Sequence, residues 1–106
     1  MIEEITVSEL NKKISNKEDF ILLDVRTDSE YYLSNIEGAI HIPMNSVPDT
    51  LDSIKRDKEI IVQCKSGVRS SRVCEFLLKS GYADVKNLKG GIVAWAEQID
   101  PSILVY

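Results

Sequence analysis

Long apolar stretches are missing from this 106-residue sequence, and no run approaches the ~20 residues that a membrane-spanning helix needs. The opening residues, Met1 to Glu4, are acidic and lack the basic and apolar regions of a signal peptide. The sequence therefore predicts a protein that does not bind membranes and that works in the cytoplasm.

Positive charge is also scarce, since 13 Lys and Arg residues stand against 17 Asp and Glu residues, for a formal net charge of −4. Without a basic stripe, we expect no nucleic-acid partner. His41 is the only histidine, which argues against a metal site. No phosphate-loop glycine pattern or dinucleotide fingerprint is present, and we expect no cofactor.

Cysteine is limited to Cys64 and Cys74. If one helix joins them, ten residues at about 1.5 Å each separate the two by roughly 15 Å. A disulfide needs Cα atoms within about 7 Å, so we expect no bridge between them. Two free thiols fit a reducing compartment.

Apolar runs rich in β-branched residues alternate with helical patterns along the chain. The runs predict buried strands at residues 20–23, 39–42, 60–63 and 85–88, and a short strand at Ile5–Val7. Helices are expected after Ser8 as N-cap, at 28–33 (capped by Asp28 or Ser29), at 45–55, at 72–79 and near the end of the chain. This alternation predicts an α/β fold, a parallel sheet with helices on both faces, in a single domain over residues 1–106.

Residues 60–71 predict a strand, a tight loop and a helix, with Cys64 at the turn and Gly67 at a position that favours positive φ. Free amide N–H groups in such a loop form a nest that attracts an anion, here the thiolate of Cys64 itself. The helix dipole, Lys65 and Arg69 all favour the charged sulfur, which predicts a lowered pKa for an accessible Cys64. A thiolate of this kind is a nucleophile.

The pattern Cys64-x-x-Gly67-x-Arg69-Ser70 resembles the active-site loop of the rhodanese family of sulfurtransferases. Further family markers follow in the family's order: Asp24-Val25-Arg26, Glu30-Tyr31, Gly38-Ala39, Ile42-Pro43, Gly90-Gly91 and Trp95. The resemblance covers essentially the whole chain and implies a rhodanese-like sheet of about five parallel strands. Ser34-Asn35 departs from it, because the family usually has Gly-His there.

The resemblance also implies roles for individual residues. Cys64 is the expected catalytic nucleophile, which takes sulfur from thiosulfate or a persulfide donor and passes it to a nucleophilic acceptor. The expected substrate and persulfide loop consists of Lys65, Ser66, Gly67, Val68 and Arg69, and the expected supporting residues are Asp24, Arg26 and Ser70. The partners are then a small anionic sulfur donor and a thiol or sulfur-carrier protein as acceptor.

Two other functions stay open at this point. A cysteine phosphatase or arsenate reductase would use the same thiolate, but related phosphatases place five residues between cysteine and arginine, and this chain places four. A non-catalytic binding or regulatory module is the second alternative.

The ending from Trp95 to Ser102 resembles the rhodanese domains fused to adenylyltransferases of molybdopterin and thiamine synthesis, which implies delivery to a ubiquitin-like sulfur carrier.

Four further residues carry structural predictions. His41 is either a general base for Cys64 or a packed strand residue, and the second is favoured because no other residue supports a dyad. Cys74 is predicted to be a small buried residue rather than a resolving thiol. Trp95 is predicted in the core, and Glu30 is expected to pair with Arg26 four residues earlier.

Overall fold

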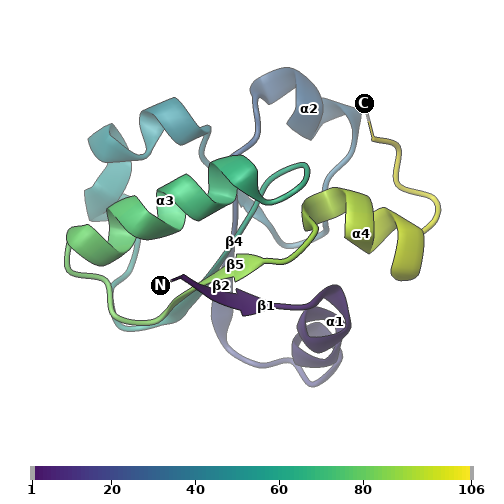
Figure 1. The fold of residues 1–106 in the computed structure, drawn as a ribbon, viewed down its shortest axis with the longest axis horizontal. Coiled ribbons are helices and arrows are strands. Elements are labelled where there is room, and N and C mark those ends of the chain that lie inside the picture. Colours follow the sequence, from purple (N-terminus) through teal and green to yellow (C-terminus); the bar gives the residue numbers. More distant parts are fainter. Residues whose placement is uncertain (1, 106) are drawn as a thin grey trace.

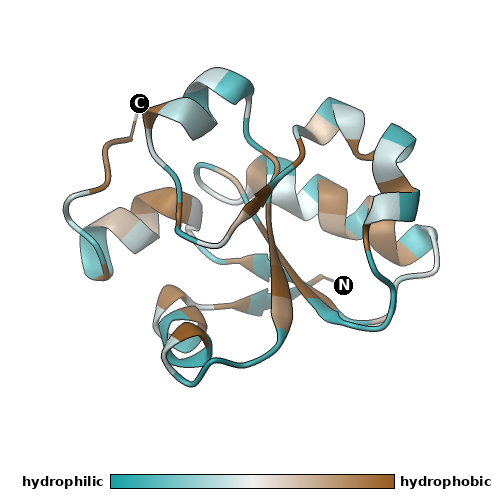
Figure 2. Cartoon of the chain, turned by 180° about the vertical axis from the view of Figure 1, so that it is seen from behind, coloured by the Kyte–Doolittle hydropathy of each residue, from teal (hydrophilic) through white to brown (hydrophobic). Residues whose placement is uncertain are grey.

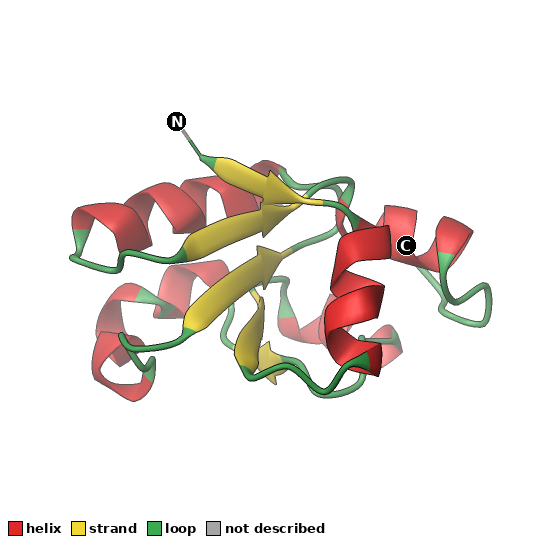
Figure 3. Ribbon diagram, turned by 90° about the horizontal axis from the view of Figure 1, so that it is seen from below, coloured by secondary structure: helices red, strands yellow, loops and turns green. Residues whose placement is uncertain are grey.

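The computed structural model describes residues 2–105, so the predicted domain 1–106 includes two residues, Met1 and Tyr106, outside the described part. Its strands form one sheet in the order β1-β5-β4-β2-β3, and every neighbouring pair is parallel. The strands are β1 (Glu3–Ile5), β2 (Phe20–Asp24), β3 (Ile40–His41), β4 (Glu59–Gln63) and β5 (Val85–Leu88). Figure 3 shows the arrows running the same way, which gathers their carboxyl ends at one edge. The predicted five-stranded parallel sheet is confirmed.

Helices cover both faces of this sheet. They are α1 (Val7–Ser15), α2 (Asp28–Leu33), α3 (Val68–Lys79) and α4 (Gly91–Gln98). Helix α3 packs on β4 and β5, whereas α1 and α4 pack together on the opposite side (Figure 1). Within residues 2–105, none of the helices has the length and apolar character needed to cross a membrane.

The central strand β4 contributes side chains to two separate hydrophobic cores, one on each face of the sheet. Ile60 and Val62 belong to the cluster that includes Leu77 of α3, while Ile61 belongs to the cluster that includes Leu10 of α1 and Ile92 of α4. A strand buried on both faces needs apolar residues at successive positions, which explains the continuous run at 60–62. Figure 2 shows the inner strands as the brown, hydrophobic centre of the chain.

The N-caps of two helices lie one or two residues earlier than predicted. Thr6 caps α1 and Thr27 caps α2, each in a complete capping box with a glutamate three residues on, Glu9 and Glu30. The prediction of Ser8 as N-cap is therefore wrong, as are Asp28 and Ser29 for the second helix. A capping box satisfies two free N–H groups at once, and this favours the threonines over a serine without that partner.

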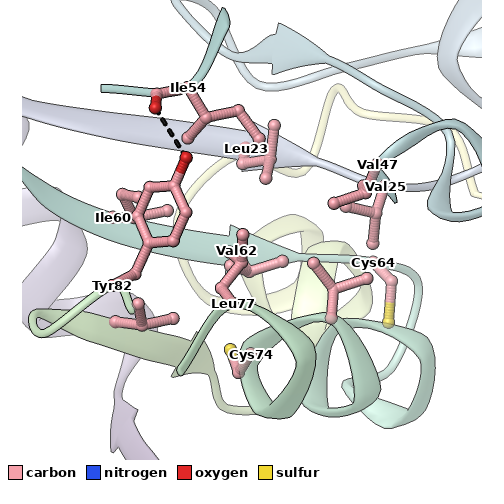
Figure 4. Close-up of a cluster of buried hydrophobic side chains, with 12 residues drawn as sticks. Leu23, Val25, Val47, Ile54, Ile60, Val62, Cys64, Cys74, Leu77 and Tyr82 are labelled. Atoms are coloured by element: carbon pink, nitrogen blue, oxygen red, sulfur yellow. Dashed lines mark hydrogen bonds between the residues drawn. The ribbon is translucent and has the colours of Figure 1, made fainter. Parts of the chain in front are cut away.

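The segment predicted as one helix over 45–55 forms two short 3-10 helices, η1 (Met44–Ser46) and η2 (Pro48–Ser53). Pro48 has no N–H to continue a helix from the preceding turn, and the backbone leaves helical geometry again at Thr50. The Tyr82 hydroxyl reaches this segment and donates to the carbonyl of Ile54 at 2.7 Å (Figure 4). The segment thus closes the core on the α3 side of the sheet.

Candidate active site

Cys64 directly follows β4, and the loop after it enters α3 at Gly67. Gly67 has φ of 113°, in the left-handed region that side chains rarely adopt, so the positive φ expected there is confirmed. The turn brings the first residues of α3 back over the end of β4. As a result, the sulfur of Cys64 lies beneath the amino end of that helix.

Hydrogen-bond donors of the loop and helix point at the sulfur. The amide nitrogens of Gly67 and Ser70 lie 3.1 and 3.4 Å from Cys64 Sγ, and Ser70 Oγ lies 3.3 Å from it. Burial raises the pKa of Cys64, but hydrogen bonds from Ser70, Gly67 and Ser66 outweigh it and leave the pKa below the ordinary thiol value. The loop therefore favours a thiolate.

Cys64 is only 1% exposed, which corrects the expectation of an accessible thiol. Its side chain joins the core cluster on the α3 side, and Figure 4 shows its sulfur at the end of that cluster. The same amides that stabilise the thiolate enclose it, because a sulfur surrounded by N–H donors leaves little surface for water. The lowered pKa therefore comes chiefly from hydrogen bonds rather than from exposed cations.

The Gly90-Gly91 pair approaches the loop closely, as predicted. Helix α4 begins here, and its amides at Ile92 and Val93 donate to the carbonyls of Cys64 and Lys65 at 2.9 and 3.1 Å. A Cβ at Gly91 would lie 2.4 Å from the Lys65 carbonyl oxygen. Glycine is required because the two backbones touch, and this contact fixes the loop from the α4 side.

Arg69 forms an ion pair with Glu30 of α2. Its two terminal nitrogens lie 2.6 and 2.9 Å from the two carboxylate oxygens. The pairing holds the pKa of Glu30 at about 2 and raises that of Arg69. Arg69 therefore braces the loop against α2, and the charge that it directs toward Cys64 is largely neutralised.

The predicted side-chain pair of Arg26 with Glu30 is wrong. Arg26 Nη2 lies 2.7 Å from Asp24 Oδ2, and both residues are buried, at 2% and 0% exposed. The same guanidinium donates to the backbone carbonyls of Glu30 and Ser34. Asp24 ends β2 two residues before Arg26, and its carboxylate also accepts the Arg26 amide. The pair therefore holds the guanidinium against the carbonyls of α2.

Asn87 of β5 is the residue that sequence reasoning missed. Its Oδ1 accepts the Ser70 hydroxyl at 2.5 Å, and its Nδ2 donates to the Gly67 carbonyl at 3.1 Å. Asn87 is 4% exposed. The signal for it was a polar side chain within an otherwise buried strand at the carboxyl edge of the sheet. Gly67 and Ser70 are the residues whose amides surround Cys64 Sγ, and together with the loop between them and Cys64 they form the sulfur cradle. Asn87 connects both residues to β5.

The remaining candidates lie apart from the sulfur cradle. His41 Nε2 is 2.8 Å from the Arg26 carbonyl, and its ring stacks on Tyr31 with centroids 4.2 Å apart, which agrees with the packed reading. Cys74 is fully buried, and burial raises its pKa to about 12. Cys64 and Cys74 are both free thiols. Trp95 is 6% exposed and lies in the core, as predicted.

The fold and the loop define a class of α/β protein. In this class, a cysteine at the carboxyl edge of a parallel sheet has its sulfur surrounded by backbone amides of the following loop and helix. The sequence matches the Rhodanese-like domain family over residues 6–98, and the chain belongs to that family.

Three comparisons illustrate the relationship. The chain is 38% identical over 96 residues to a protein named "Sulfurtransferase" from Allochromatium vinosum, covering 91% of this chain and 90% of that one. It is 35% identical over 104 residues to the probable adenylyltransferase/sulfurtransferase MoeZ of Mycobacterium tuberculosis, covering 96% of this chain but 26% of that protein. The crystal structure of a rhodanese-like domain protein from Staphylococcus aureus superposes with a TM-score of 0.86 at 34% identity and 99% coverage of both chains.

Proposed function

We propose that the chain is a rhodanese-type sulfurtransferase that carries sulfane sulfur as a persulfide on Cys64. The observation that carries the proposal is the ring of donors from Gly67 and Ser70 around Sγ, which stabilises a thiolate inside a family whose relatives are named sulfurtransferases. The other residues of the loop contribute in different ways. Ser66 acts through its backbone amide and Arg69 through its ion pair with Glu30. Lys65 contributes positive charge, and Val68 is the first residue of α3.

The reaction has two half-reactions. In the first, the Cys64 thiolate attacks the outer sulfur of a donor such as thiosulfate, an S–S bond forms to Sγ, and sulfite leaves with the electron pair of the broken bond. In the second, a nucleophilic acceptor attacks the outer sulfur of the persulfide, and the Cys64 thiolate is the leaving group. Donors aimed at the loop centre stabilise the anionic sulfur in both steps.

An open groove beside the loop gives the donor and acceptor a place to approach. It is lined by Glu4, Ser66, Gly67, Val68, Ser71, Arg72 and Asn87. Arg72 in the groove and Lys65 in the loop attract an anionic donor such as thiosulfate or a persulfide. Because Cys64 is 1% exposed, the proposed reaction requires the loop that encloses its sulfur to open before a donor can reach it.

We further propose a sulfur-carrier protein as the physiological acceptor. This class of acceptor is supported by the similarity of the chain to the MoeZ protein, a probable adenylyltransferase/sulfurtransferase, of which it covers 26%. The carrier would receive the sulfur at its C-terminus. With such a carrier the outer sulfur of the Cys64 persulfide is the nucleophile: it attacks the activated C-terminal carbonyl carbon and displaces the activating group, which gives an acyl disulfide. A thiol then attacks Cys64 Sγ and releases the carrier's thiocarboxylate, and a second thiol reduces the mixed disulfide left on Cys64. A cytoplasmic location belongs to the same proposal, since both cysteines are free.

The test is thiocyanate production from thiosulfate and cyanide by wild type, Cys64→Ser and Cys74→Ser. We expect activity in wild type and Cys74→Ser and none in Cys64→Ser. If thiosulfate fails, a cysteine desulfurase that donates a persulfide replaces it. Failure with both donors would favour a binding module. Turnover of a phosphate ester by wild type but not Cys64→Ser would favour the phosphatase alternative, against which the four-residue spacing between Cys64 and Arg69 counts.

A further inference from the structure

In the sulfur cradle, Cys64 and Asn87 both contact the hydroxyl group of Ser70. Ser70 has one hydroxyl hydrogen, and Oγ lies 3.3 Å from Cys64 Sγ and 2.5 Å from Asn87 Oδ1. Both neighbours can accept it when Cys64 is a thiolate, but only one can have it. The hydroxyl therefore links the charge on the sulfur to the hydrogen bonding of a side chain on β5.

The orientation of the Asn87 amide follows from its other contact. Nδ2 lies 3.1 Å from the Gly67 carbonyl oxygen, which is an acceptor, so the NH2 group must face Gly67. The carbonyl oxygen Oδ1 then faces Ser70 and has no hydrogen of its own. Consequently, Ser70 is the donor in that contact, and while it donates to Asn87 it can only accept a hydrogen bond from Cys64.

This arrangement suits the neutral thiol. The S–H group of Cys64 donates to Ser70 Oγ, and the Ser70 hydroxyl donates to Asn87 Oδ1, so each hydrogen has an acceptor. When the Cys64 proton leaves to solvent, the Ser70 hydroxyl must rotate its hydrogen to Sγ to stabilise the thiolate. Asn87 Oδ1 then loses its hydrogen bond. Because Asn87 is only 4% exposed, water does not replace that bond, and the loss costs free energy.

We propose that Asn87 is a positioning residue that competes with Cys64 for the hydroxyl hydrogen of Ser70 and so holds Cys64 partly in the thiol form. The amides of Gly67 and Ser70 favour the thiolate, and Asn87 opposes them through the shared hydroxyl. Ser70 can lower the pKa of Cys64 only by giving up its bond to Asn87, so Asn87 limits that lowering.

A consequence that rests on the proposed function concerns the loaded state. Once Sγ is bonded to a second sulfur, the negative charge moves to the outer atom and Ser70 can return its hydrogen to Asn87. The competition thus destabilises the free thiolate relative to the persulfide. It restrains the unloaded nucleophile and favours its loading with sulfur.

Other charged or titratable groups around Cys64 remain the same in the variants used to test this. They are Arg69 and Cys74 of α3, Glu30 of α2, the buried pair of Asp24 and Arg26, and Lys65 of the loop. Arg69 is paired with Glu30, and Cys74 stays neutral at ordinary pH because its pKa is about 12. The effect of Asn87 is therefore separable from theirs.

The experiment is a pH titration of the Cys64 Cβ carbon by NMR in protein with labelled cysteine, with the Cys64 signal assigned from Cys64→Ser. The variants are Asn87→Ala, Ser70→Ala and the double variant, with Asn87→Leu as a second change that keeps the bulk of the side chain. This titration needs no sulfur donor, so its outcome is independent of whether the chain transfers sulfur.

We expect Asn87→Ala and Asn87→Leu to lower the pKa of Cys64 and to raise its thiolate fraction at a given pH about threefold to tenfold. Ser70→Ala is expected to raise the pKa, and in that background the change at Asn87 should no longer lower it. If Asn87 only held the loop through Gly67, its loss would loosen the amide cradle and raise the pKa in both backgrounds. A rise, no change, or an equal fall with and without Ser70 would overturn the proposal.

Discussion

Arg69 and Glu30 bind each other through two parallel hydrogen bonds, at 2.6 and 2.9 Å, and so connect the sulfur loop to α2. The pair joins residues 39 positions apart in the sequence. Glu30 also closes the capping box of α2 with Thr27, so one carboxylate begins a helix and braces the loop. A loop with this support keeps its amides directed at the sulfur.

Replacement of Glu30 by glutamine tests this brace. Glutamine keeps an oxygen for Thr27 but loses the charge that faces Arg69. We expect unfolding free energy at pH 7 to fall by about 1–2 kcal/mol, a value reduced by solvent screening of a partly exposed pair. Urea unfolding measures it, and the exposed Glu97→Gln is the control.

The pH dependence of the same pair has a definite sign. The pKa of Glu30 is about 2 in the folded protein against an ordinary value of 4.5, so its contribution to stability is present above about pH 4.5 and is lost as the pH falls toward 2. The stability difference between wild type and Glu30→Gln should therefore shrink on acidification through that window. A difference that stays constant from pH 7 to pH 3 would contradict the assigned pairing.

Alanine at Gly91 should disrupt the loop, whereas alanine at Gly38 should not. Both glycines have positive φ, of 59° and 89°, but a Cβ at Gly91 would meet the Cys64 and Lys65 carbonyls within 2.5 Å and one at Gly38 meets nothing within 4 Å. We expect Gly38→Ala to cost about 1 kcal/mol of backbone strain and Gly91→Ala at least about 2 kcal/mol more. Urea unfolding measures both, and equal losses would show that the two backbones do not touch.

Much of this fold follows from local sequence patterns, and much of the site does not. The strand at 85–88 and the helix at 28–33 were predicted with their observed limits, because apolar period and length determine them. The capping threonines were missed since neighbouring residues also suited the role. Asn87 and the Arg69–Glu30 pair were missed because they depend on which strands and helices become neighbours, and the burial of Cys64 depends on how the loop folds over it.

Gln63 of β4 carries a buried amide whose nitrogen and oxygen have no hydrogen-bond partner within residues 2–105. An unsatisfied buried amide destabilises a fold, and methionine fills a similar volume without polar atoms that need partners. We expect Gln63→Met to raise the unfolding free energy by about 1–2 kcal/mol, with exposed Gln98→Met near zero. Chemical denaturation measures it. A loss of stability would mean that the amide has a partner, such as a buried water molecule.

The two cysteines should differ sharply toward alkylating agents. The pKa of Cys64 is lowered by its hydrogen bonds, whereas burial raises that of Cys74 to about 12. At pH 8 we expect iodoacetamide to modify Cys64 slowly, as loop opening allows, and Cys74 only in denaturant. Peptide mass analysis separates the two sites, and modification of Cys74 first in the native protein would refute the assignment.

The most direct test of the central claim is the intact mass of the protein after incubation with thiosulfate, compared between wild type and Cys64→Ser. We predict that wild type gains the mass of one sulfur atom, that cyanide removes it, and that Cys64→Ser gains nothing. A gain that survives the loss of Cys64 would contradict its role as the sulfur carrier. No gain in wild type from thiosulfate or from a desulfurase persulfide would contradict the sulfurtransferase account itself.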